Sequence, residues 1–315
     1  MTWSVAALAA VLLWSAAGPW ALRAFHRRLG PSAGAMLALW TLTTVTWLLA
    51  CAVLLATLVT QVMGPGVKAF VAACADLLQA VHANGAESGL VIAGILGGAG
   101  LARLSWTAVR RRGARVAWTR EHGRELSASG RRRTLHLDRV WLVDTPEPAA
   151  YCLPGRGLGI VVTRGALDQL NASELRAVLA HERAHLDGRH HFLVTWTRLL
   201  DNAFPGVPLL RTAAREVPEL VEWAADDRAA REVGPHALAH ALGIMAASGA
   251  RGPEPALSAS GACPVRRVRR QVRAPEPSAG LVVNAAAALV VVLPLALTVL
   301  ATVLNVAVPH CECVG

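Results

Sequence analysis

Charged residues are missing from four long stretches of this 315-residue chain. The stretches without Asp, Glu, Lys or Arg are residues 1–22, 33–63, 88–102 and 278–309. A helix needs about 20 apolar residues to cross a bilayer core of about 30 Å, and the third stretch reaches that length if Arg103 extends its charged end to the surface. With 54% hydrophobic residues, the pattern excludes an ordinary soluble domain and predicts four membrane helices. The first stretch is also compatible with a signal peptide, but it has no basic residues at its start.

Acidic residues are also few, with 21 Asp and Glu against 31 Lys and Arg and a net charge of +10. Arginines gather after the first and third apolar stretches and before the fourth, mainly in residues 23–28, 110–124 and 266–273. By the positive-inside rule, the central region is therefore cytoplasmic and both termini lie outside. This charge predicts contact with anionic membrane lipid. We expect no direct nucleic-acid binding, because the cluster Arg131–Arg133 is not accompanied by a recognition fold.

Cysteine is scarce as well, and the six residues are not spaced as a disulfide or zinc framework. Cys311 and Cys313 fall in a short outer tail, where they could pair with another chain to form a homo-oligomer. Two free thiols explain the same pattern equally well.

The most informative motif is His181-Glu182-Arg183-Ala184-His185. Residues four apart share one face of a helix, so His181 and His185 can offer two imidazole nitrogens to one metal ion. Glu182 then lies beside the metal as the base that takes a proton from bound water. Just before the motif, Asn171 and Glu174 form a capping-box pattern that predicts where this helix begins. The motif therefore predicts a zinc peptidase, the alternative being an ordinary solvated helix face.

A second helix, predicted within residues 217–232, supplies the remaining groups. Glu222 is the expected third zinc ligand, and Asp226, on the same face, is expected to hydrogen-bond a ligand histidine. Glu219 lies one turn earlier and is an alternative ligand. For His190 and His191, a structural or solvated role is favoured over ligation. The apolar residues 191–204 are too short to span a bilayer and are expected to continue the metal helix.

A small sheet is predicted before the metal helix, with strands at residues 134–137, 140–143, 150–153 and 159–163. The last two strands read as a hairpin. An extended peptide could add a strand to the edge of such a sheet, which would hold its scissile bond near the zinc. Tyr151, the only tyrosine, either lines that cleft or is a half-buried strand aromatic.

Several segments in order resemble the BlaR/MecR type of membrane zinc metallopeptidase, and the metal motifs are also similar to those of HtpX and the CAAX prenyl proteases. The segments are Tyr151–Arg156, Ile160–Thr163, Ala177–Leu186 and Glu222–Asp227. The resemblance implies a mainly α fold with four transmembrane helices and an inserted cytoplasmic α+β domain of the zincin (gluzincin) class. It implies Zn²⁺ held by His181, His185 and Glu222, with Glu182 as catalytic base and Asp226 behind the ligands.

The expected organisation is three transmembrane helices in residues 1–110, a peptidase domain in 111–275, and a fourth helix with a short outer tail in 276–315. Sensors of the BlaR/MecR type carry a penicillin-binding domain after the last span, and we expect none here, because about six residues follow the fourth apolar stretch. We therefore expect a multi-pass cell-membrane metalloendopeptidase that cleaves a cytoplasmic protein. The BlaR/MecR resemblance implies that this substrate is a winged-helix transcriptional repressor. The alternatives are an HtpX-like quality-control protease and a non-catalytic receptor or scaffold.

Overall fold

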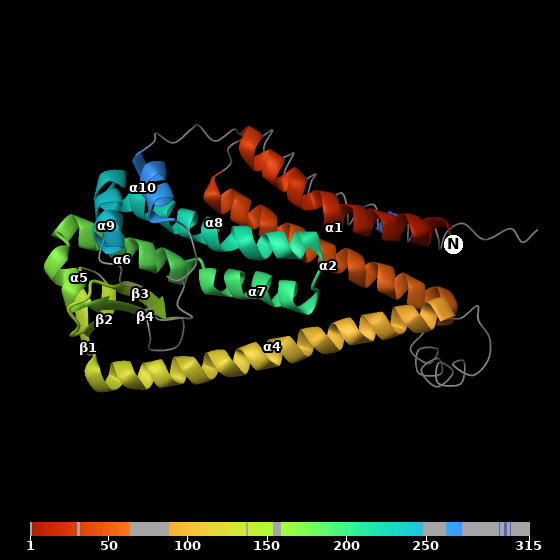
Figure 1. The fold of residues 1–315 in the computed structure, drawn as a ribbon, viewed down its shortest axis with the longest axis horizontal. Coiled ribbons are helices and arrows are strands. Elements are labelled where there is room, and N and C mark those ends of the chain that lie inside the picture. Colours follow the sequence, from red (N-terminus) through yellow and green to blue (C-terminus); the bar gives the residue numbers. More distant parts are fainter. Residues whose placement is uncertain are drawn as a thin grey trace, which may run out of the picture.

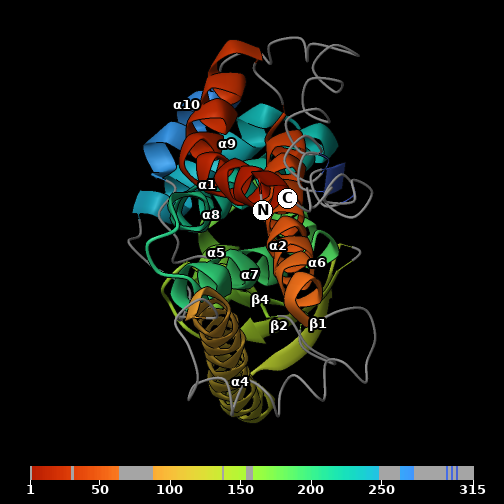
Figure 2. The same ribbon diagram turned by 90° about the vertical axis from the view of Figure 1, so that its right-hand side faces the viewer.

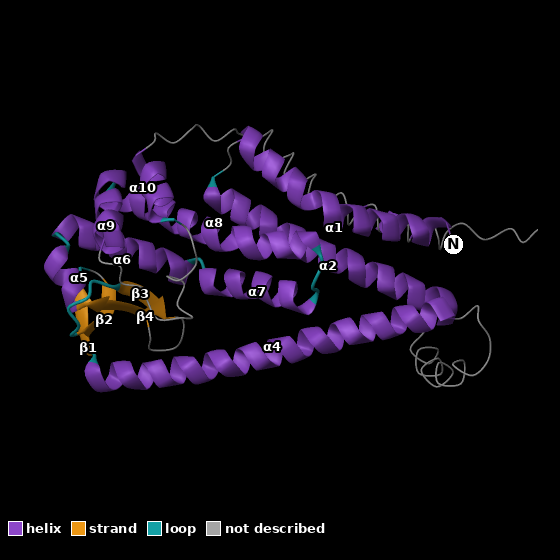
Figure 3. Ribbon diagram, in the orientation of Figure 1, coloured by secondary structure: helices purple, strands orange, loops and turns teal. Residues whose placement is uncertain are grey.

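The computed structural model describes residues 2–29, 32–63, 88–136, 138–153, 159–247 and 263–272, together with residues 296, 299, 300 and 303. The four strands gather at one end of the molecule (Figures 1 and 3), beside α5 (Arg164–Gln169), α6 (Ala172–Asp187), α9 (Pro235–Ala247) and α10 (Pro264–Val272). The long helix α4 (Ser88–Ser129) runs from this end to the opposite one, and α1 (Thr2–Leu29) and α2 (Ala33–Met63) also extend toward that opposite end (Figure 1).

Two N-terminal helices are long and apolar enough to cross a membrane. α1 (Thr2–Leu29) contains the segment Val5–Arg27, and α2 (Ala33–Met63) contains Ala33–Thr57. No such segment is found in the described part of α4 (Ser88–Ser129), an unbroken helix of 42 residues that also includes the predicted domain boundary at residue 110. The predicted fourth span lies almost entirely outside the described residues. Two of the four predicted spans are thus found by length and composition.

The apolar N-terminal helices share a hydrophobic core with the helices that follow the metal motif. This core joins Leu22 of α1 and Trp40 of α2 to Leu200 of α7 (His190–Ala203) and Leu209 of α8 (Pro208–Val233), all of which are fully buried or nearly so. Seen along the long axis, α1, α2, α7 and α8 lie together above α4 (Figure 2). The helix that carries Glu222 is therefore packed directly on both candidate membrane helices.

The sheet consists of β1 (Arg131–Leu135), β2 (Asp138–Val143), β3 (Ala150–Leu153) and β4 (Gly159–Thr163), in the order β1-β2-β4-β3. β1 pairs antiparallel with β2, β2 parallel with β4, and β3 antiparallel with β4. The β3–β4 hairpin was predicted correctly, but β1 begins three residues earlier than predicted. β1 therefore includes Arg131–Arg133, and the guanidinium of Arg132 lies 4.6 Å from the centre of the Trp141 ring.

Opposite faces of the sheet are covered by different helices. On one face, Val140, Ile160 and Val162 pack against α5 (Arg164–Gln169) and α6 (Ala172–Asp187), where Leu179 is buried. On the other face, Tyr151 and Val161 pack against Leu126 near the end of α4. α9 (Pro235–Ala247) and α10 (Pro264–Val272) complete the domain beside α6 and α8. The sheet thus supports α6, the helix with the metal motif, from one side.

Candidate metal centre

The metal helix α6 begins where its capping box predicts. The Asn171 side chain accepts hydrogen bonds from the backbone N–H groups of Ser173 and Glu174, at 2.9 and 3.0 Å. The Glu174 carboxylate accepts the Asn171 backbone N–H in return, at 2.9 Å. These bonds satisfy N–H groups that the first turn of a helix leaves free. The start of α6, and with it the position of the motif two turns later, is therefore fixed by local sequence.

Three side chains from two helices converge on one buried point. His181 and His185 come from α6 and Glu222 from α8, and one ligand atom of each lies within 4.8 Å of the others. The two Nε2 atoms are 3.0 Å apart, and the Glu222 oxygens lie 3.6 Å from His181 Nε2 and 3.5 Å from His185 Nε2. Ligand atoms about 2.0–2.1 Å from a tetrahedral zinc ion are separated by roughly 3.3 Å. The three groups therefore fit a zinc ion both in chemistry and in spacing.

Asp226 lies behind this cluster, as the sequence predicts. Its Oδ1 is 3.0 Å from Nδ1 of His181, and its side chain is completely buried one turn beyond Glu222 on α8. A carboxylate that accepts the Nδ1–H of a histidine leaves the Nε2 lone pair free for a metal. Asp226 is thus placed where it can accept this hydrogen bond, and its role toward a metal stays a prediction.

Glu182 is also buried, next to His181 on α6. Burial, reinforced by the nearby charge of Glu222, raises the pKa of the Glu182 carboxyl to about 7. Cys152 of β3 lies close to Glu182, so the carboxyl is beside the sheet. Such a group can gain and lose a proton near neutral pH.

The alternative ligand Glu219 lies outside the cluster. Its carboxylate forms an ion pair with Arg266 of α10 at 2.8 Å, and its side chain is 22% exposed. Between the two glutamates, the structure brings Glu222 to the histidines.

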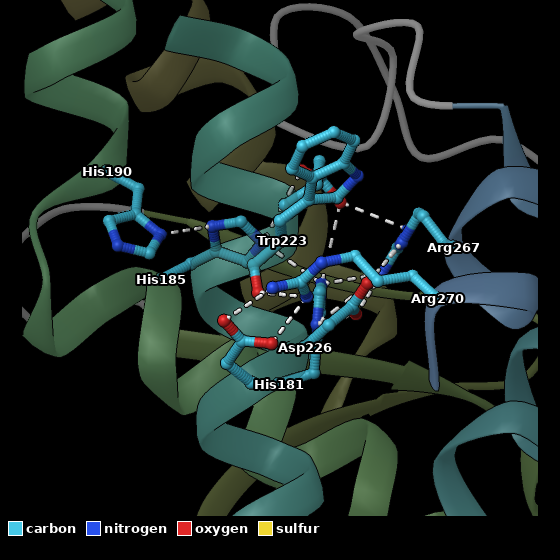
Figure 4. Close-up of polar contacts among 9 residues, drawn as sticks. His181, His185, His190, Trp223, Asp226, Arg267 and Arg270 are labelled. Carbon is cyan, nitrogen blue, oxygen red and sulfur yellow. Dashed lines mark hydrogen bonds and ion pairs between the residues drawn. The ribbon is translucent and has the colours of Figure 1, made fainter. Parts of the chain in front are cut away.

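Arg267 is a member of the site that the sequence analysis missed, because the arginines of residues 266–273 were interpreted as flanking a membrane helix. Its guanidinium lies 2.6 Å from Asp226 Oδ1, 3.1 Å from Glu222 Oε2 and 3.3 Å from His181 Nε2. Figure 4 shows it approaching from α10 opposite the α6 histidines. No local pattern could have identified it, since α10 meets the site only through tertiary packing.

His190 is a second residue whose contact with the site was not predicted from the sequence. The expected continuation of α6 across residues 191–204 is wrong: α6 ends at Asp187, and a separate helix, α7, begins at His190. This break turns the His190 ring onto His185, with the two Nδ1 atoms 2.9 Å apart (Figure 4). His190 is buried rather than solvated, and its contact with the predicted ligand His185 was not foreseen. That it is not itself a ligand stays a prediction.

Tyr151 does not line the candidate cleft. Its ring is buried on the sheet face opposite α6, and its hydroxyl lies 3.0 Å from His122 Nε2 of α4. The structural alternative given for this residue is the correct one.

Burial and neighbouring charges shift the pKa values of the histidines and carboxylates in the centre. Burial lowers the pKa of His185 to about 3 and that of His190 to about 4. Burial acts the same way on His181, but hydrogen bonds with Asp226 and Glu222 outweigh it and raise its pKa to about 9. For Glu222, burial is outweighed by His185, His181 and Arg267, so its pKa falls to about 2. Glu222 and Asp226 are therefore ionised at neutral pH and attract a cation.

Comparisons with known proteins point in the same direction. Residues 113–215 match the family model of Peptidase family M48, a match that includes the His181–His185 motif and ends before Glu222. The chain is 40% identical over 68 residues to a protease HtpX homolog of Aquifex aeolicus (strain VF5), which covers 21% of this chain and 22% of the relative. It is 34% identical over 98 residues to a protease HtpX homolog of Pelotomaculum thermopropionicum (strain DSM 13744 / JCM 10971 / SI), which covers 30% and 31%. No solved structure matches the chain.

These similarities, with the buried His-His-Glu cluster and two apolar N-terminal helices, support a membrane-associated metalloprotease. The matches extend over less than a third of the length of these curated relatives. They support the HtpX part of the predicted resemblance and give no support to the BlaR/MecR part.

Proposed function

We propose that this chain is a zinc-dependent endopeptidase that cleaves proteins at a membrane surface. The convergence of His181, His185 and Glu222 carries the proposal. Catalytic zinc sites have three protein ligands and an open position, whereas structural sites are closed by four. The group found among the described residues has three members, and Glu182, which has no role in a purely structural site, is buried beside it.

Each residue of the centre then has a chemical task. His181 and His185 would hold the ion through Nε2, and Glu222 through its carboxylate. When bound, zinc supplies a Lewis acid and a water molecule of lowered pKa. Glu182 takes the proton from the attacking water and delivers it to the leaving amine, a transfer suited to its pKa of about 7. Asp226 holds His181 in the tautomer that presents Nε2 to the ion.

The sheet offers a means of holding the substrate. β3 is an edge strand of the described sheet, packs against α6 and carries Cys152, which lies close to Glu182. An extended peptide that pairs with β3 would lie alongside Glu182, held by main-chain hydrogen bonds. This mode of binding requires an unfolded or extended segment of protein as substrate.

The similarity to HtpX homologs favours membrane-protein quality control as the biological role. The packing of α8 on α1 and α2 supports it, because Val221, the neighbour of Glu222, belongs to the core shared with both apolar helices. The centre would then lie close to the membrane surface, on the cytoplasmic side according to the arginine distribution. Cleavage of a transcriptional repressor is a second candidate and rests on the BlaR/MecR resemblance of the motifs alone.

The test compares protein fragments in native cells that express the wild type or the variant Glu182→Gln. Quality control predicts many membrane-protein fragments that depend on Glu182, whereas regulated signalling predicts one cleaved repressor. Zinc content of both purified proteins is measured in parallel. Identical fragment profiles with zinc bound in both would favour the non-catalytic receptor or scaffold, and the absence of zinc from the wild type would refute the metal centre itself.

A further inference from the structure

His190 packs edge-on against His185 at the back of the candidate metal centre. The ring centres are 4.9 Å apart and the rings are nearly perpendicular, at 86°. The two Nδ1 atoms are 2.9 Å apart, a hydrogen-bond distance, and both side chains are buried. The polar contact of His190 is therefore with Nδ1 of His185 (Figure 4), whereas Nε2 of His185 lies 3.5 Å from Glu222.

The hydrogen positions of this pair follow from the direction of the ligand atoms. His185 points Nε2 toward His181 and Glu222, so a metal would bind there and Nε2 must carry no hydrogen. The hydrogen of neutral His185 is then on Nδ1, and the acceptor that faces it among the described residues is Nδ1 of His190. His190 must accept with Nδ1 and carry its own hydrogen on Nε2.

The chain between the two helices makes room for this ring. A Cβ atom on Gly188 would lie 2.4 Å from Nε2 and 2.6 Å from Cδ2 of His190, so the ring fills the space that a side chain would need. The next residue, Arg189, has a left-handed backbone with φ 48°, a conformation that non-glycine residues rarely adopt. A glycine and a left-handed residue in succession thus turn the first residue of α7 back onto α6.

We propose that His190 is a positioning residue for the metal ligand His185. It accepts the Nδ1–H of His185 and so fixes both the tautomer and the orientation of the ring that presents Nε2 to zinc. Partners of ligand histidines are usually carboxylates, carbonyls or water, and their loss weakens metal binding about 10–100-fold. A second imidazole takes this part here. The inference rests on the proposed zinc centre.

Three substitutions separate hydrogen bonding from packing. His190→Asn places an amide oxygen near the position of Nδ1, where it can accept the bond from His185. His190→Gln places its amide near the position of Nε2 instead, away from His185, and His190→Phe keeps a ring without an acceptor. His191→Phe is the matched control, because it changes the neighbouring histidine of α7, which lies near Arg115 and Arg189.

The experiment measures zinc affinity by chelator competition on the purified full chain, with thermal unfolding of the metal-free form as a check on folding. We expect affinity to fall about 10–100-fold for His190→Phe and His190→Gln, and to remain within a few-fold of wild type for His190→Asn and His191→Phe. Cobalt(II) spectra should change in the first two variants and remain unchanged in the last two.

The outcomes separate the two proposals. A wild type that binds no zinc refutes the metal centre. A wild type that binds zinc while all variants bind equally well overturns the role of His190. Equal losses for His190→Asn and His190→Gln would also overturn it, since packing alone would explain them. If His190→Phe does not fold, the comparison of Asn with Gln still decides.

Discussion

The guanidinium of Arg267 lies 2.6 Å from Oδ1 of Asp226 and is the cation that α10 brings into the metal centre. Asp226 has no exposed surface, and Arg267 also contacts Glu222 at 3.1 Å. A buried carboxylate without a positive partner is strongly unfavourable. Arg267 therefore supplies positive charge to Asp226 and Glu222, two buried carboxylates that would have no cationic partner in the metal-free protein if Arg267 were removed.

Arg267→Gln should destabilise the metal-free protein by about 3 kcal/mol, because it leaves buried carboxylates unpaired. The loss should be smaller with zinc bound, since the ion supplies positive charge at the same place. Denaturant unfolding with and without zinc measures both values. Arg269→Gln, an exposed change on the same helix, is the control and should have little effect. Equal losses in both metal states would contradict this account.

Glu182→Gln should abolish peptide hydrolysis while zinc content stays at the wild-type value. The amide keeps the size of the side chain but cannot accept the proton, and loss of such a base typically costs 10²–10⁴-fold in rate. The measurement is cleavage of an unfolded membrane-protein substrate, with zinc determined on the same sample. Loss of zinc in this variant would mean that Glu182 helps to hold the metal.

Glu222→Ala should reduce bound zinc to background, whereas Glu219→Ala should retain it. The reason is geometric, since Glu222 reaches both histidines and Glu219 is paired with Arg266. Metal analysis of the two purified variants is sufficient. If Glu222→Ala retained zinc and Glu219→Ala lost it, Glu219 rather than Glu222 would be the third ligand.

Gly165→Ala should destabilise the fold by about 1–3 kcal/mol, the usual cost of forcing extra atoms into a packed site. An added Cβ would lie 1.9 Å from the carbonyl oxygen of Pro146, so the loop before β3 must move. Gly113→Ala is the matched control: its Cβ would meet nothing within 4 Å on α4, and alanine favours a helix by about 1 kcal/mol. Thermal unfolding of both variants checks that the first substitution lowers the stability of the protein and the second raises it.

Local interactions explain why much of the centre could be predicted. Each of these features lies within one or two turns of a single helix: the capping box at Asn171 and Glu174, and the four-residue spacing of His181 and His185. Glu222 and Asp226 could be predicted for the same reason, because one helix face carries both. Orientation in the membrane and the fourth span depend on charge and hydropathy alone and stay predictions.

What the sequence by itself determined is the set of groups that periodic local structure places together: the two histidines, the glutamate between them, and the acidic pair one turn apart on α8. Only the tertiary structure decided which distant groups complete the centre. Arg267 reaches Asp226 across 41 residues, and His190 reaches His185 because α6 stops at Asp187 and the chain turns back. Those contacts depend on how whole helices pack. A buried carboxylate such as Asp226 requires a cation, and the ligand imidazole of His185 requires a hydrogen-bond acceptor. These requirements do not determine which segment of the chain supplies the partner.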